Sequence, residues 1–305
     1  MALFEVPKVE TERRLLTDRF VAPPFSILDT KQGYWQKRKR EWLNILGDLS
    51  ATRDGQYGQV GNSSHADRVN IYDNINGGTS NFDPVLAEII YRWFCVPGGK
   101  IIDPFGGEQT KGVVAGVLGY EYEAVEIRKE QVDYNNEKTA KYKNVKYYCG
   151  DSNNIDTLIT DTNFDLCFTS PPYYDLEIYS EEDLSSLGTY EEFMDNYKNI
   201  FKKCYDKMAD TSFLVVKITE IRDRKTGIYR GFVPDNIRIM EEIGFKYYNE
   251  IILENTIGSL PIRAPRQFDA KRKVGKHHQN VLVFLKGNED GIAKKYPTMD
   301  EIMQL

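Results

Sequence analysis

From about Lys100 onward, short apolar runs alternate with longer amphipathic segments. Strands that alternate with helices in this way are typical of an α/β protein with a wound parallel sheet. The apolar runs predict strands at Lys100–Ile102, Tyr122–Glu126, Val145–Tyr148, Asp165–Thr169, Ser212–Ile218, Tyr247–Leu253 and Asn280–Leu285. Apolar residues at helical spacing predict helices between them at Thr110–Leu118, Lys129–Tyr142, Tyr190–Met208 and Pro234–Ile243.

The last two predicted strands follow one another with no helix predicted between them. Consecutive strands without a crossover helix pair antiparallel, so we expect this pair to close one edge of the sheet. The segment that connects them, Ile257–His278, contains two prolines and two glycines and is predicted to be a loop.

The first 80 residues have a different pattern. Pro23 and Pro24 interrupt the chain, and Lys31–Ile45 is predicted to be an amphipathic helix with Trp35 and Trp42 on one face. Gly55 to Gly78 is rich in Gly, Asn, Ser and Tyr and is predicted to be loop. We therefore divide the chain into an N-terminal extension (1–78), an α/β domain (79–290) and a C-terminal tail (291–305).

Composition places the chain among soluble globular proteins. Of its 305 residues, 41% are hydrophobic and 28% charged, and no stretch approaches the length of a membrane-spanning helix. The N-terminus lacks the apolar core of a signal peptide. Four widely spaced cysteines and three histidines indicate neither a zinc site nor a disulfide framework. We expect a reduced, cytoplasmic protein without a metal or a membrane contact.

The fourth predicted strand ends in Ser170-Pro171-Pro172-Tyr173, with a hydroxyl before the two prolines and an aromatic ring after them. Consecutive prolines fix the backbone and remove two N–H donors, so the neighbouring carbonyl groups are left to accept hydrogen bonds. This strand end is therefore suited to hold an amino group.

Three further strand ends indicate a cofactor site. The first strand ends in the glycine-bearing turn Asp103–Thr110, the second ends in Glu126 about 20 residues after that turn, and the third is followed by Asp151. Such a turn before a helix presents N–H groups to an anionic ligand, an acid at the second position can bind a ribose, and the next acid suits an adenine amino group. Taken singly, these residues are more typical of helix starts and caps; their joint spacing favours a cofactor.

The run DPFGGEQT, Glu126, Asp151 and TSPPY together resemble the amino-group DNA methyltransferases, which use S-adenosyl-L-methionine to modify cytosine N4 or adenine N6. The resemblance covers about Thr79 to Gly287 and implies a Rossmann-like class I methyltransferase sheet. It assigns cofactor binding to Ser80, Phe82, Asp103, Pro104, Phe105, Gly106, Gly107, Thr110, Glu126, Ile127, Asp151 and Ser152. It assigns catalysis to Ser170, Pro171, Pro172 and Tyr173.

An exocyclic amino group is a weak nucleophile because its lone pair is delocalised into the ring. Acceptors at the Ser170 Oγ and the Pro171 carbonyl would take its two hydrogens and turn the lone pair toward the methyl donor, while Tyr173 stacks on the base. The base must leave the duplex to reach this pocket. Methylation at carbon 5 of cytosine would need a cysteine nucleophile after a proline, and the chain has none.

One part of the cofactor turn departs from the family pattern. The family turn usually reads DPFxGxGT, whereas Gln109 stands here at the second glycine, with Glu108 beside it. Gln109 could contribute its backbone N–H as glycine would. The departure concerns how the methionine part of the cofactor is held.

Local positive charge indicates where DNA could bind, although the net charge of the chain is −6. The Ile257–His278 segment carries one acid, Asp269, against six basic residues, namely Arg263, Arg266, Lys271, Arg272, Lys273 and Lys276. A basic loop beside the active edge could follow phosphates, and an arginine could reach a guanine edge. Lys37 to Arg40 are a weaker candidate.

The sequence therefore predicts methylation of a flipped base in double-stranded DNA. A serine before the two prolines favours cytosine N4. Three alternatives stay open: adenine N6 methylation, methylation of an amide nitrogen in RNA or protein, and an inactive DNA-binding homologue.

Overall fold

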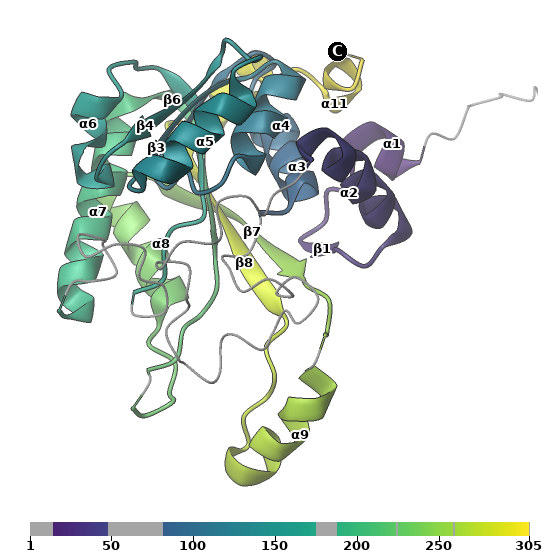
Figure 1. Cartoon of the computed structure of the whole chain (residues 1–305), viewed down its shortest axis with the longest axis vertical. Coiled ribbons are helices and arrows are strands. Elements are labelled where there is room, and N and C mark those ends of the chain that lie inside the picture. Colours follow the sequence, from purple (N-terminus) through teal and green to yellow (C-terminus); the bar gives the residue numbers. More distant parts are fainter. Residues whose placement is uncertain (1–14, 48–81, 175–187, 224, 259, 305) are drawn as a thin grey trace, which may run out of the picture.

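The computed structural model describes residues 15–47, 82–174, 188–223, 225–258 and 260–304. An eight-stranded sheet with the strand order β1-β7-β8-β6-β5-β2-β3-β4 forms its centre (Figure 1). The strands are β1 (Ile27–Asp29), β2 (Lys100–Asp103), β3 (Glu121–Glu126), β4 (Val145–Cys149), β5 (Phe164–Thr169), β6 (Met208–Ile218), β7 (Lys246–Glu254) and β8 (His278–Lys286). Only β8 runs antiparallel to its neighbours in this sheet. The predicted Rossmann-like α/β fold with an antiparallel final pair is confirmed.

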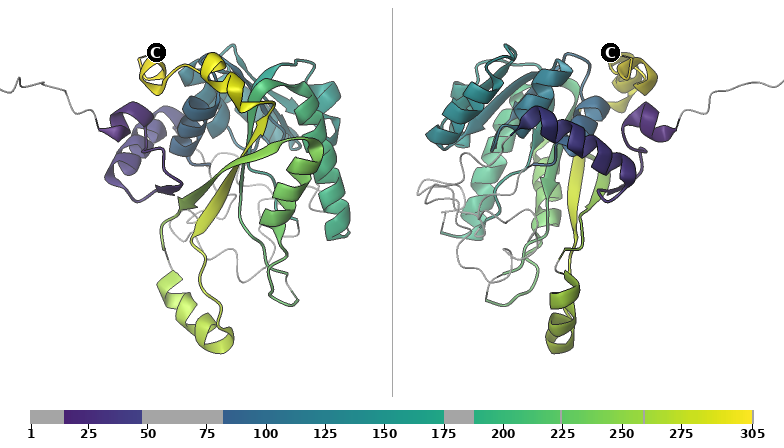
Figure 2. Two further views of the ribbon diagram at one scale, coloured as in Figure 1. Left: turned by 180° about the vertical axis from the view of Figure 1, so that it is seen from behind. Right: turned by 45° about the vertical axis from the view of Figure 1, so that its right-hand side comes forward.

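Helices cover both faces of the sheet (Figure 2). The longer ones are α2 (Gly33–Leu46), α3 (Pro84–Phe94), α4 (Thr110–Leu118), α5 (Lys129–Thr139), α7 (Tyr190–Lys207), α8 (Phe232–Ile243) and α9 (Leu260–Lys271). The shorter ones are α1 (Leu16–Phe20), η1 (Ser152–Asn154), α6 (Ile155–Leu158), η3 (Glu289–Gly291), α10 (Ile292–Lys295) and α11 (Met299–Ile302). Side chains of α2 to α5 join the core cluster on one face, and those of α6 to α8 join the cluster on the other. None of these helices, in the ranges described, is long and apolar enough to cross a membrane.

The central strands were predictable because both of their faces are buried. On β6, Phe213 and Val215 belong to one core cluster, while Leu214 and Val216 belong to the other. Successive side chains of a strand point to opposite faces, so a strand that is covered on both sides has a continuous apolar run. The bounds of the predicted strands and of the helices between them agree with the structure to within a few residues.

The predicted closure of the sheet edge needs a correction. Strands β7 and β8 do pair antiparallel, but β8 lies between β6 and β7. The outermost strand is β1, which comes from the N-terminal extension and pairs parallel with β7, from Ile27 beside Ile252 to Asp29 beside Glu254. A strand of three residues is too short to show the alternation by which the other strands were predicted.

The loop predicted at Ile257–His278 contains a helix, α9. Pro261 lies in its first turn, where a missing N–H costs little, but Pro265 lies inside the helix. Leu260, Ala264 and Phe268 recur at helical spacing, but none of the side chains of α9 is buried, and two prolines interrupt this short pattern. The two prolines therefore favoured a loop.

The buried carboxylate of Glu88 on α3 fastens α2 to the domain. It accepts hydrogen bonds from Arg38 Nε at 2.6 Å, Trp42 Nε1 at 2.8 Å and Arg92 Nε at 2.9 Å. Burial raises the pKa of Glu88, but the bonds from Arg38 and Trp42 and the charges of both arginines outweigh burial and leave the pKa below its ordinary value. Trp35 and Trp42 are both buried, as expected for one face of this helix.

Replacing Glu88 by Gln should lower the free energy of unfolding by about 3 kcal/mol, because two arginines lose their anionic partner inside the protein. The lowered pKa means that this stabilisation is complete above the pKa of an unfolded glutamate and is lost as the pH falls through the folded value. Denaturant unfolding at pH 7 and pH 3 measures both effects. Exposed Glu137 on α5 is the control, and an equal loss in Glu137→Gln would contradict the assignment.

Candidate active site

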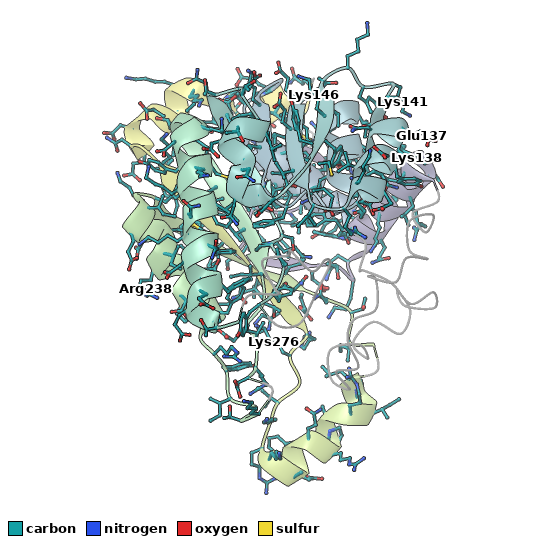
Figure 3. The ribbon with its side chains drawn as sticks, turned by 60° about the vertical axis from the view of Figure 1, so that its left-hand side comes forward. Glu137, Lys138, Lys141, Lys146, Arg238 and Lys276 are labelled. Atoms are coloured by element: carbon teal, nitrogen blue, oxygen red, sulfur yellow. The ribbon has the colours of Figure 1, made fainter. Side chains whose placement is uncertain are left out.

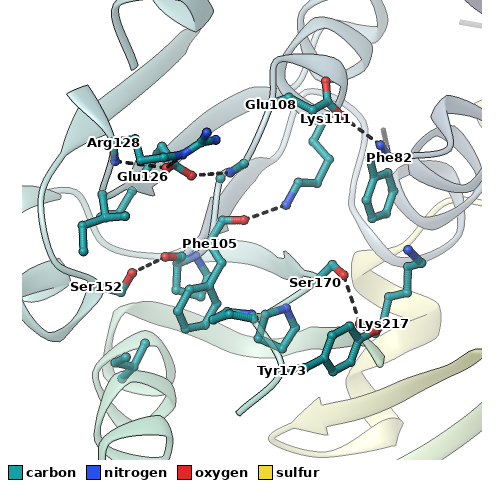
Figure 4. A pocket seen from close by; sticks show the side chains of 18 of the residues that line it. Phe82, Phe105, Glu108, Lys111, Glu126, Arg128, Ser152, Ser170, Tyr173 and Lys217 are labelled. Atoms are coloured by element: carbon teal, nitrogen blue, oxygen red, sulfur yellow. Dashed lines mark hydrogen bonds and ion pairs between the residues drawn. The ribbon is translucent and has the colours of Figure 1, made fainter. Parts of the chain in front are cut away.

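A pocket opens where the carboxyl ends of β2 to β5 meet (Figure 4). Thirteen of the predicted residues line it, namely Phe82, Pro104, Phe105, Gly106, Gly107, Glu126, Ile127, Asp151, Ser152, Ser170, Pro171, Pro172 and Tyr173. The lining also includes Glu108, Lys111, Val125, Arg128, Ile200, Lys217 and Gln279, which had not been assigned. The fold thus brings the predicted cofactor turn and the Ser170–Tyr173 segment to one pocket. Predicted Ser80 lies outside the described residues.

The glycine turn packs closely against the end of β3. The Gly106 N–H donates to the Val125 carbonyl at 2.7 Å, and a Cβ on Gly106 would lie only 3.1 Å from the Ala124 Cβ. Gly107 has a φ of +60°, in the left-handed region that favours glycine. Its N–H donates to Glu126 Oε2 at 3.1 Å. The turn and the acid of the next strand are therefore held side by side.

Asp103 and Thr110, both predicted to bind the cofactor, do not line the pocket. The fully buried Asp103 carboxylate forms an ion pair with Lys111 Nζ and accepts from Thr169 Oγ1 at 2.7 Å, Tyr122 OH at 2.7 Å and the Phe105 N–H at 3.0 Å. Lys111 Nζ also donates to the Phe105 carbonyl at 3.0 Å. Asp103 thus supports the wall of the pocket from behind.

The departure from the family turn adds a carboxylate to the pocket wall. Glu108 accepts from the Phe82 N–H at 3.0 Å and from the N–H and Oγ1 of Thr110, both at 2.7 Å. Burial raises the pKa of Glu108, although these bonds oppose the rise. Gln109 is buried and does not line the pocket. The side chain of Gln109, which stands where the family has glycine, therefore does not occupy the pocket.

Two acids lie at adjacent strand ends in the same wall. Glu126 accepts from the Arg128 N–H at 3.0 Å and from Arg128 Nε at 3.1 Å, in addition to the Gly107 N–H. Burial raises the pKa of Glu126 against the charge and hydrogen bonds of Arg128. Asp151 accepts from the Asn153 N–H at 2.8 Å and caps η1. Ser152 Oγ donates to the Pro104 carbonyl, which joins this wall to the glycine turn.

Ser170 lies across the pocket from these acids (Figure 4). Its Oγ donates to the Lys217 carbonyl at 3.2 Å. Because the hydroxyl proton is used in this bond, the oxygen is left to act as an acceptor. Tyr173 is half-buried, with its ring edge-on to Phe232 at 6.1 Å, whereas the following Tyr174 is buried in the core.

Two lysines that were not predicted flank the ring of Phe82. Lys217 Nζ lies 4.9 Å and Lys111 Nζ 5.5 Å from the ring centroid, within the range of cation–π contact. Lys217 had one signal in the sequence, since it interrupts the apolar run of β6. Lys111 had none, because a lysine in a first helical turn is commonplace. The two are far apart in the chain, and only the fold brings them together.

The six predicted DNA-binding residues lie away from the pocket. Helix α9 carries Arg263, Arg266 and Lys271, and Arg272, Lys273 and Lys276 follow it. The helix projects beyond the carboxyl edge of the sheet (Figures 1 and 2). Of the weaker candidates on α2, Arg38 is bonded to Glu88, and Lys39 pairs with Asp83 at 3.2 Å. Within the described ranges, no three His, Cys, Asp or Glu residues are placed to hold a metal ion.

Comparison with known proteins gives one family match. Residues 164–304 match the DNA methylase family of N6 and N4 methyltransferases. No curated protein sequence matches the chain.

Several solved structures have a similar fold. TrmN from Thermus thermophilus is 14% identical over 67% of this chain and 49% of its own, with a TM-score of 0.43. A methyltransferase from Pyrococcus furiosus is 14% identical over 68% of this chain and 84% of its own, with a TM-score of 0.44. A TehB-like SAM-dependent methyltransferase from Corynebacterium glutamicum is 18% identical over 62% and 80%, with a TM-score of 0.39. The chain thus spans about half the length of the first of these proteins.

All three TM-scores lie below 0.5, so the fold assignment rests on the strand order of the sheet itself. The family match covers β5 with the Ser170–Tyr173 segment and continues through the antiparallel strand. The resemblance read from the sequence is thereby confirmed over residues 164–304, which match the DNA methylase family.

Proposed function

We propose that this protein transfers a methyl group from S-adenosyl-L-methionine to the exocyclic amino group of a flipped base in double-stranded DNA, with cytosine N4 as the target. The observation that carries the proposal is the pocket shared by the Gly106–Gly107 turn, Glu126 and the Ser170 hydroxyl. In this proposal residues 79–290 form the catalytic domain. Part of the N-terminal extension (1–78) supports it, through the contacts of α2 with α3.

The lining of the pocket fits S-adenosyl-L-methionine. When bound, the cofactor supplies an electrophilic methyl group on a sulfonium. Glu126 would hold the ribose hydroxyls, and Asp151 would approach the adenine amino group. Phe105, Ile127 and Ile200 present apolar surface to a flat ring. At the other end, the carboxylate of Glu108 suits an ammonium group, and the lysines beside Phe82 suit a carboxylate.

The Ser170–Tyr173 segment fits an amino group. The Ser170 hydroxyl already gives its proton to the Lys217 carbonyl, so its oxygen would accept one hydrogen of the amino group. The Pro171 carbonyl would accept the other, which turns the nitrogen lone pair toward the methyl donor and lets a proton leave the nitrogen afterwards. Tyr173 would stack on the base. The two prolines hold these acceptors in place without competing donors.

The choice of cytosine rests on the family tendency for a serine before the two prolines, and adenine N6 is the second candidate. Methylation of an amide nitrogen in RNA or protein is a further alternative. The basic residues on and after α9 favour a nucleic acid over a protein substrate. Mass spectrometry of nucleosides from methylated DNA identifies the base. N4-methylcytosine supports the proposal, N6-methyladenine corrects the base, and an unmodified digest contradicts the activity.

Replacing Ser170 by Ala should lower kcat by about 10²- to 10³-fold, because the amino group loses one acceptor in the transition state. Cofactor affinity should stay nearly unchanged, since Ser170 faces the base and not the cofactor turn. Transfer of labelled methyl groups and calorimetry with S-adenosyl-L-methionine measure the two. Tyr173→Ala should also lose activity, while Tyr173→Phe, which keeps the ring, should retain it. A fully active Ser170→Ala enzyme would refute the assignment.

Replacing Glu126 by Gln should weaken cofactor binding by roughly tenfold or more, because the ribose loses charged hydrogen-bond acceptors. The pKa of Glu126 is raised, so cofactor affinity of the wild type should fall as the pH drops through that raised value. The variant should lose this pH dependence. Glu123 lies on the same strand but pairs with Lys146 and Tyr148, so Glu123→Gln is the matched control. Equal affinities of all three proteins would count against a ribose contact.

Replacing both Arg263 and Arg266 by Ala should weaken DNA binding similarly for all sequences if they contact phosphates. The plot of log affinity against log salt should then become shallower by about 1.8. Fluorescence anisotropy between about 50 and 300 mM salt measures the slope. Lys138 is exposed on α5, and Lys138→Ala serves as the control. Unchanged affinity would move recognition to another part of the chain.

A further inference from the structure

A second basic element projects from the active edge. Soon after β6, residues 221–223 and 225–230 form the two sides of a β-hairpin, in which the Arg230 N–H donates to the Ile221 carbonyl at 2.9 Å and the Asp223 N–H to the Ile228 carbonyl at 2.9 Å. Arg222 pairs with Tyr229 across the hairpin. The sequence analysis assigned no role to this segment.

The hairpin is held rigidly at its base. The Glu220 carboxylate accepts from the N–H groups of Gly231 at 3.0 Å, Phe232 at 2.9 Å and Val233 at 3.2 Å. These bonds fix the end of the hairpin to the first turn of α8. A hairpin that is ordered before it meets a ligand loses little conformational entropy on binding.

The turn of the hairpin is ordered too. One oxygen of Asp223 accepts from the backbone N–H groups of Lys225 at 3.0 Å and Thr226 at 2.7 Å, and the other pairs with Arg230 at 2.7 Å. The charge of Asp223 is therefore offset within the hairpin by the ion pair with Arg230.

The hairpin and the segment after α9 leave the sheet side by side, next to the pocket. They extend from adjacent strands, because Ile218 of β6 pairs with Asn280 of β8. Lys217 and Gln279, close to these strand ends, both line the pocket. Lys273, just after α9, reaches the turn of the hairpin, where its Nζ lies against Gly227. The hairpin, drawn in green before α8, and α9 project on the same side in both views (Figures 1 and 2).

The tip of the hairpin has the chemistry of a DNA contact. Lys225 is exposed, and the side chains of Ile228 and Tyr229 are 68% and 42% exposed. The Arg222 guanidinium stacks on the Tyr229 ring at 3.8 Å and donates to the Gly227 carbonyl at 3.1 Å. Proteins that distort DNA combine phosphate-binding cations with apolar side chains placed against unstacked bases.

We propose that this hairpin, through its described residues 221–223 and 225–230, is a DNA-binding arm, which acts together with α9 and the segment after it. Lys225 contacts a phosphate, and Ile228 packs against bases exposed beside the flipped nucleotide. This inference rests on the proposed function, since it takes double-stranded DNA as the substrate. It places part of the DNA contact between the pocket and α9, where Lys273 and Lys276 lie.

We would titrate the wild-type protein and two variants, Lys225→Gln and Ile228→Ser, with an unmethylated DNA duplex that the wild-type protein methylates. Lys225→Gln should weaken binding by roughly three- to tenfold near 0.1 M salt and make the salt dependence shallower by about 0.9, as expected for one lost phosphate contact. Ile228→Ser should lower affinity without changing that slope. Lys141→Gln is the control, because exposed Lys141 lies beside Lys138, well separated from Lys276 (Figure 3). Thermal melting and cofactor calorimetry confirm that each variant is folded.

The outcomes separate this inference from the function on which it rests. A wild-type protein that methylates DNA, with both hairpin variants unchanged in affinity and salt slope, would overturn the hairpin and leave the function standing. A wild-type protein that binds the cofactor but neither binds nor methylates DNA would overturn both. Tighter binding of the matching RNA duplex, or a dimer that Ile228→Ser disrupts without any change in DNA affinity, would also overturn the proposal.

Discussion

The buried carboxylate of Asp103 fixes the geometry on which the rest of the site depends. Its side-chain partners come from three elements, because Tyr122 lies on β3, Thr169 ends β5 and Lys111 belongs to α4. A buried charge is costly unless it is paired and fully hydrogen-bonded, and Asp103 meets both conditions. Phe105 precedes the two glycines of the turn and Thr169 precedes Ser170, so one carboxylate sets the separation between the glycine turn and Ser170.

Where both faces of a strand are buried, the bounds predicted from the sequence agree closely with those in the structure. The apolar runs of β2, β3, β5 and β6 gave these strands nearly correct bounds, because both faces of the sheet are covered. Where burial is absent, the same reasoning failed. Helix α9 buries no side chain and contains two prolines, and β1 is only three residues long, so the apolar positions predicted neither element.

Within the site, the sequence indicated which strand ends matter but not which direction each side chain takes. Asp103 reads as a ligand-binding acid at a strand end, yet it points into the protein interior. Lys217 reads as an interruption of an apolar strand, yet it reaches Phe82 beside the pocket. Contacts between residues so far apart in the sequence depend on how several elements pack together, and local sequence patterns do not predict this packing.

The antiparallel direction of β8 determines on which side of the molecule the connection between β7 and β8 lies. If β8 were parallel to β7, it would have to begin where β7 begins, at the amino ends of the parallel strands. The connection after β7 would then have to cross a face of the sheet, away from the side where the pocket lies. Because β8 runs the other way, it begins beside the end of β7, and all of residues 255–277 can stay on the active side. One reversed strand therefore gives this edge an insertion that can grow or change without disturbing the hydrophobic layers beneath it. The segments proposed to contact DNA can in this way vary independently of the strands that form the pocket.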